Sequence, residues 1–166
     1  ADAAHRVLRG IPATDSYRQG AEEMMRTTTT MALDAVWPVG RALARVFQRS
    51  DEINWAGLAI DTESWREMLL ASPPHIALID PLGFRQCTAQ LVQFTRSVSP
   101  QTKCVVFVPT VAEPIVQRWY DAGADACVAK WMHPESIISI VAKVRKGTFV
   151  RSEIDELISP MTATAG

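Results

Sequence analysis

The chain has 166 residues, of which 48% are hydrophobic and 21% are charged, and its formal net charge is −1. This composition is typical of one globular domain with a true core, and it excludes a disordered chain. The near-neutral charge supplies no basic field for nucleic acid. The apolar runs are too short to span a bilayer, and residues 1–10 lack the apolar core of a signal peptide, so we expect a cytoplasmic protein without membrane contact.

Residues 1–30 read as an N-terminal extension. A stripe of apolar residues at helical spacing predicts a short amphipathic helix within it: Tyr17, Ala21, Met24 and Met25. The threonine run at 27–30 favours extended structure that leads into the first strand.

Residues 31–147 alternate between strand-like apolar runs and amphipathic helical segments. The strand-like runs are 31–36, 53–59, 75–80, 103–108 and 125–129. Pro38 and Pro134 stand at favoured helix starts, and Gly123 marks a helix end. Five strands alternating with five helices predict an α/β fold with a parallel sheet covered on both faces. Right-handed crossovers at this size favour the flavodoxin-like strand order 2-1-3-4-5.

The carboxyl ends of the predicted strands carry a recognisable layout. PHIALID ends in Asp80, TKCVVFV supplies the next strand, and AGADACVAK ends in Lys130. This layout resembles a response-regulator receiver domain, the module that accepts a phosphoryl group on an aspartate at a strand end. The resemblance covers about residues 31–158. It implies that Asp80 stands at the phosphoacceptor position and Lys130 at the position of the family's lysine.

Other parts of the phosphorylation machinery are missing from their positions. Receivers hold Mg²⁺ with the acceptor aspartate and an acidic pair after the first strand, because a hard cation must neutralise the developing charge. WPVGRAL resembles the helix start of NarL-type receivers, and this alignment puts Ala35 and Val36 at the acidic pair. Val108 stands where the family has Thr or Ser, and Cys127 where it has the switch aromatic.

We therefore interpret the chain as a degenerate (pseudo-)receiver in which Asp80 and Lys130 form a structural ion pair. Asp34 lies one position before the acidic pair, and a one-residue slip turns a side chain to the opposite face. We expect it to reach the site only through a bulge. Two alternatives stay open. Asp80 could be phosphorylated with Asp34 as an unorthodox Mg²⁺ ligand, or a small ligand could bind a pocket of Asp34, Trp37, Val108 and Trp131.

No other chemistry has a motif in this sequence. The phosphate-binding G-x-x-x-x-G-K-[ST] loop, the dinucleotide-binding G-x-G-x-x-G and the hydrolase G-x-S-x-G are all absent. We expect no enzymatic activity, no cofactor and no metal site. The three cysteines lack metal-ligand spacing and are expected to be reduced structural thiols: Cys87, Cys104 and Cys127.

The C-terminal segment indicates a biological role. RKGTFVRSEIDELISPM resembles the stretch through which NarL-type receivers continue into a LuxR-type helix-turn-helix domain, and we interpret 148–166 as linker or tail. The resemblance implies that the chain is the regulatory half of a transcriptional regulator. We expect DNA to be contacted only through a C-terminal domain absent from this chain. We expect a homodimer, with Met24 and Met25 as a candidate docking arm. The candidate interface residues are Trp119, Tyr120 and Met132.

Overall fold

The computed structural model describes residues 27–84, 88–109 and 113–151. The expected N-terminal helix, its docking arm, Cys87 and most of the C-terminal tail lie outside these residues. Strands and helices alternate along the described part: β1 (Thr28–Leu33), α2 (Trp37–Phe47), β2 (Ile53–Ala59), α3 (Thr62–Ala71), β3 (Ile76–Ile79), α4 (Thr88–Val98), β4 (Lys103–Val108), α5 (Glu113–Asp121), β5 (Ala126–Ala129) and α6 (Pro134–Lys146).

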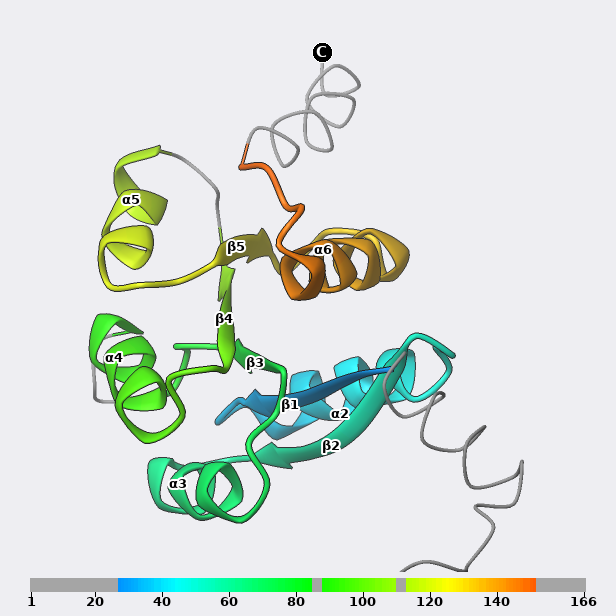
Figure 1. Cartoon of the computed structure of the whole chain (residues 1–166), viewed down its shortest axis with the longest axis horizontal. Helices are drawn as coiled ribbons and strands as arrows, with labels where there is room; N and C mark the ends of the chain where they lie inside the picture. The colour runs from blue at the N-terminus through cyan, green and yellow to red at the C-terminus, as the bar shows by residue number, and fades with distance from the viewer. Residues whose placement is uncertain (1–26, 85–87, 110–112, 152–166) are drawn as a thin grey trace, which may run out of the picture.

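The strands form one parallel sheet in the order β2-β1-β3-β4-β5, which confirms the predicted flavodoxin-like topology. Helices α3, α4 and α5 cover one face, and α2 and α6 cover the other (Figure 1). No helix among the described residues is long and apolar enough to cross a membrane.

The two faces of the sheet carry separate cores. Every residue of β3 and β5 is buried, because helices cover both faces and alternate side chains point to each. The core under α3, α4 and α5 includes Leu33, Ile79, Val106, Trp65 and Trp119. The core under α2 and α6 includes Ala32, Leu78, Val128, Phe47 and Ile140.

Local signals set several helix ends. Helix α3 begins after Asp61, whose carboxylate accepts a hydrogen bond from the Ser64 N–H at 2.7 Å. Helix α6 has Pro134 in its first turn. It ends at Gly147, whose φ of 71° lies in the left-handed region that glycine adopts without strain.

Strand β1 differs from its predicted bounds. It begins at Thr28, three residues before the predicted start, and it ends at Leu33. Thr30 is fully buried, and its hydroxyl donates to the Thr28 carbonyl oxygen at 3.2 Å, so the polar group is satisfied inside the sheet. The pairing of β1 with β2 is interrupted by a bulge, where the partner residue jumps from Trp55 to Gly57.

Candidate functional site

The carboxyl ends of β1, β3 and β5 bring Asp34, Asp80 and Lys130 together. Leu33 pairs with Ile79 in the sheet, so the two aspartates follow residues that lie side by side. The Asp80 N–H donates to the Leu33 carbonyl oxygen at 2.9 Å, which continues the ladder by one residue. All three charged side chains line one small cavity.

The three side chains share a face because the strand period is two. Ala32, Leu78 and Val128 stand two residues before them, and all three belong to the core under α2 and α6. The expectation that Asp34 reaches the site only through a bulge is therefore wrong. The pairing of β1 with β3 is regular, and the bulge lies in the pairing of β1 with β2.

The Asp80 carboxylate is engaged on both oxygens. Its Oδ2 forms an ion pair with the Lys130 ammonium, and its Oδ1 accepts a hydrogen bond from the Leu82 N–H at 2.9 Å. Asp80 is only 3% exposed. Burial makes an ionised carboxylate costly unless its charge is compensated, and here a cation and an N–H supply that compensation.

Asp34 is fixed by its own loop and by α2. Its Oδ1 accepts a hydrogen bond from the Val36 N–H at 2.7 Å. Its Oδ2 faces Gly40, where an added Cβ would come within 3.3 Å of that oxygen, so glycine permits the close approach of the helix. Burial raises the pKa of Asp34. The Val36 hydrogen bond opposes that rise, the Asp80 charge adds to it, and the Lys130 charge opposes it.

Two buried carboxylates thus lie at one edge with one lysine, which forms an ion pair with Asp80. Among the residues that the structure describes, no group of three or more His, Cys, Asp or Glu side chains could hold a metal ion. Ala35 and Val36, the two residues after Asp34, offer no side-chain ligand for a hard cation.

The cavity at this edge has a volume of about 40 Å³, and its other walls are apolar: Ala32, Leu33, Leu43, Leu78 and Phe107. Sites for small organic ligands typically measure about 300–1,000 Å³. The space therefore suits water rather than an organic ligand.

The structure does not bring the described members of the predicted small-ligand pocket together. Of its members whose side chains the structure describes, only Asp34 lines the cavity. Val108 is buried in the core on the opposite face of the sheet. Trp131 is 43% exposed, and its indole N–H donates to the Pro109 carbonyl oxygen at 3.3 Å. The side chain of Trp37 lies outside what the structure describes.

Two of the cysteines are buried, and one of them, Cys127, stands at the predicted position of the switch aromatic. Cys127 and Cys104 are free thiols in the core, and burial raises the pKa of each to about 12. This agrees with their predicted packing role. The Tyr120 hydroxyl accepts a hydrogen bond from the Cys127 N–H at 3.2 Å, and the Arg151 guanidinium lies 4.0 Å above the tyrosine ring.

Two of the candidate interface residues are core residues within the single chain. Trp119, on α5, packs into the core that α3, α4 and α5 cover. Met132, just before α6, packs into the core that α2 and α6 cover. Each side chain is 6% exposed. The sequence pattern places Trp119 on a helix and Met132 just after a strand, and this pattern does not show whether either side chain is buried or exposed. Tyr120 is half-buried, and Trp131 is the more exposed aromatic at this edge.

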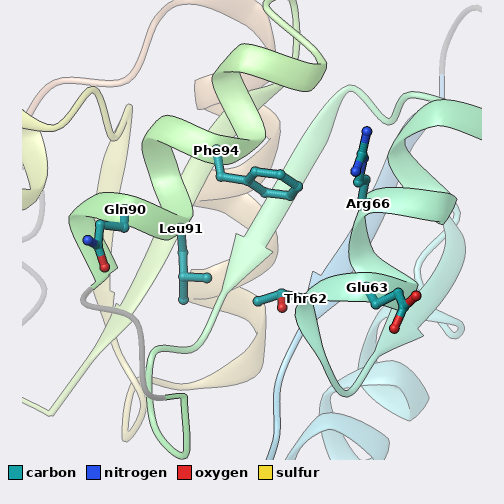
Figure 2. Close-up of a pocket in the computed structure, with 6 residues that line it drawn as sticks. All are labelled: Thr62, Glu63, Arg66, Gln90, Leu91 and Phe94. Atoms are coloured by element: carbon teal, nitrogen blue, oxygen red, sulfur yellow. The ribbon is translucent and has the colours of Figure 1, made fainter.

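Sequence reasoning did not find a hollow of about 550 Å³ between α3 and α4. Figure 2 shows Phe94 pointing from α4 toward α3, with Glu63 and Gln90 at opposite ends of the hollow. Its polar groups do not converge on one point, so it offers no built set of ligand contacts. Its other lining residues are Thr62, Arg66 and Leu91.

Comparisons with known proteins bear on this fold. No protein family profile matches the chain, and no curated protein matches its sequence. The structure is similar to the signal receiver domain of a NarL response regulator from Mycobacterium tuberculosis, with a TM-score of 0.67 and 22% identity over 74% of this chain and 98% of that one.

Two further solved structures give the same result. A LuxR-family two-component response regulator from Aurantimonas has a TM-score of 0.70 and 16% identity, over 82% of this chain and 99% of that one. RcsB from Salmonella enterica, bound to a promoter in the presence of BeF₃⁻, has a TM-score of 0.65 and 14% identity, over 82% of this chain and 67% of that one. At these identities the likeness is one of fold, and this chain has the flavodoxin-like fold of a response-regulator receiver domain.

Proposed function

We propose that this chain is a degenerate receiver domain that signals without phosphorylation, as the regulatory half of a DNA-binding transcriptional regulator. The engagement of both Asp80 oxygens, by Lys130 and by the Leu82 N–H, carries the proposal. A phosphoacceptor must present an oxygen to the donor beside a bound cation. Ala35 and Val36 provide no side-chain ligands for that cation, and Asp34 is already bonded to its own loop.

In this proposal the ion pair has a structural role. It joins the end of β3 to the residue after β5, and it offsets the charge of a nearly inaccessible carboxylate. Signalling then depends on association of the domain with itself or with another protein, and we propose a cytoplasmic homodimer. The exposed Trp131 and half-buried Tyr120 are the remaining aromatic candidates for such an interface.

DNA binding is assigned to a separate domain. The net charge of −1 gives this chain little attraction for phosphates. RcsB, one of the structurally similar proteins, was solved bound to a promoter, and the match covers 67% of that chain. By analogy, we propose that a helix-turn-helix domain follows the receiver fold in the complete regulator.

Intact-mass spectrometry tests the proposal. The protein and its Asp80→Asn variant are incubated with acetyl phosphate and Mg²⁺, and circular dichroism checks that both are folded. A response regulator that accepts phosphoryl groups from this donor is the positive control. We expect no adduct on the folded wild-type chain. An adduct that disappears in Asp80→Asn would refute phosphorylation-independent signalling.

One observation favours a second candidate, a phosphoacceptor that uses Asp34 as a Mg²⁺ ligand. Asp34 and Asp80 line the same cavity, so two carboxylates are available at the correct edge of the sheet. This candidate predicts an adduct on Asp80 that requires Mg²⁺ and is lost in Asp34→Asn. An Asp80 adduct that persists in Asp34→Asn would contradict the assigned role of Asp34.

A further inference from the structure

Another cavity lies at the opposite edge of the sheet from Asp80. It is formed by the segments that enter β3 and β4 and by the last turn of α6, and its volume is about 580 Å³. This volume lies within the range of small-molecule sites. The amino ends of parallel strands meet at this edge, so residues far apart in sequence come together: His75, Lys103 and Arg145.

The charged residues that line this cavity are of one sign. His75, Lys103 and Arg145 are basic or can become so, and no acidic residue lines the cavity. The Lys103 ammonium lies 3.3 Å from an oxygen of Asp125, which in turn pairs with Arg96 at 2.7 Å. Arg145 is exposed, and no carboxylate in the described part of the chain forms an ion pair with it. The rim of the cavity is therefore cationic.

His75 adds a neutral donor. Its Nδ1 accepts a hydrogen bond from the Thr29 N–H at 3.0 Å, so this nitrogen carries no proton and Nε2 carries it. Burial, followed by the charge of Arg145, lowers the pKa of His75, which favours this neutral form. The Nε2–H has no hydrogen-bond acceptor among the described residues and is available to a ligand.

The remaining walls are mostly apolar, with Ser99 and Gln101 as their polar members. Pro73 and Pro74 lead into β3, and Val98 and Pro100 lie beside them at the end of α4. The Ser99 hydroxyl is already bonded to Thr102 at 2.7 Å and offers little to a ligand. Proline rings fix the backbone on which they stand, so this wall needs little ordering when a ligand binds.

We propose that this cavity binds a small organic anion, with its carboxylate or phosphate group held by Arg145, Lys103 and His75. The apolar body of the ligand lies against the proline wall. Arginine and lysine form charge-assisted hydrogen bonds with both kinds of oxyanion. The site uses none of the residues around Asp80, so it is independent of the proposed phosphorylation-independent role.

Titration of the ¹⁵N-labelled chain with phenyl phosphate, followed by NMR, tests the site. We expect saturable shifts of the Thr29, His75 and Lys103 amides, with the Leu82 amide at the other edge unchanged. Benzoate in place of phenyl phosphate distinguishes a carboxylate ligand from a phosphate ligand, and saturable binding of either supports the site. The absence of saturable shifts with both anions, in a protein with a dispersed spectrum, would overturn the proposal.

Two variants separate a built site from general electrostatic attraction. Arg145→Gln should weaken phenyl phosphate binding by about tenfold, as expected for loss of one charge-assisted hydrogen bond. Lys146→Gln changes the charge of the next exposed residue equally, but this residue does not line the cavity. The Lys146→Gln variant should bind phenyl phosphate with wild-type affinity. Equal weakening of binding by both variants would refute the site. Benzyl alcohol should bind weakly or not at all, and binding as tight as that of phenyl phosphate would show that charge is not recognised.

Discussion

Replacement of Lys130 with methionine is the most direct test of the ion pair at the carboxyl edge. Lys130→Met removes the cation and keeps most of the side-chain length. The Asp80 side chain is 4% exposed, whereas that of Lys130 is 27% exposed. Removal of one partner from a fully buried pair costs about 3–5 kcal/mol. Water already screens the partly exposed ammonium, so we expect the free energy of unfolding to fall by about 2–3 kcal/mol at pH 7.

Urea denaturation at pH 7 measures this loss, with Lys146→Met as the control for an equal change in net charge. Lys146 is exposed, and its substitution should change stability by less than about 0.5 kcal/mol. The double variant Lys130→Met with Asp80→Asn should recover much of the loss, because no carboxylate at position 80 is then left uncompensated. A loss below about 0.5 kcal/mol in Lys130→Met, or an equal loss in Lys146→Met, would refute the structural role of the ion pair.

Three further predictions concern other buried polar groups. The folded state binds the Asp34 proton more tightly than the unfolded state, so stability should fall as pH rises above 3.8 toward the raised pKa, and Asp34→Asn should remove this fall in urea denaturation. Thr95→Val should cost about 1–3 kcal/mol in the same assay, because it leaves the buried Trp65 indole N–H, now 2.9 Å from the Thr95 hydroxyl, without an acceptor. The lowered pKa of His75 should make stability fall as pH drops below 6.5; His75→Asn, which keeps an acceptor for Thr29, should lack this fall, and an unchanged pH profile would contradict the reasoning.

The fold could be predicted because its signals are local and repeated. Continuous apolar runs such as 103–108 indicate strands covered on both faces, and helical segments between them require parallel crossovers. The first strand was misplaced because Thr28 and Thr30 are polar residues, and only their internal hydrogen bond shows that they fit a buried position. A hydropathy pattern cannot show a strand boundary that depends on an internal hydrogen bond of a buried polar side chain.

The site could be predicted in part. Asp80 and Lys130 end their strands, and strand ends meet at one edge. The position of Asp34 depends on the register of β1 against β3, which the sequence of β1 alone does not specify. Trp119 and Met132 illustrate the same limit, since an apolar residue at helical spacing fits either a core or an interface. The basic cavity is built from segments that are far apart in sequence, 73–75, 98–103 and residue 145, so no local motif marks it.

The exposure of Trp131 gives the domain an optical reporter at the carboxyl edge of its sheet. Trp65 and Trp119 are buried, so a soluble quencher such as acrylamide should reach Trp131 in preference to them. The Trp131 indole is held near Pro109, one residue beyond β4, and its emission should respond to rearrangement of that loop. Because Trp55 is half-buried and can also be quenched, comparison with Trp131→Phe should isolate the Trp131 signal, by which association through this edge can be followed in the unlabelled protein.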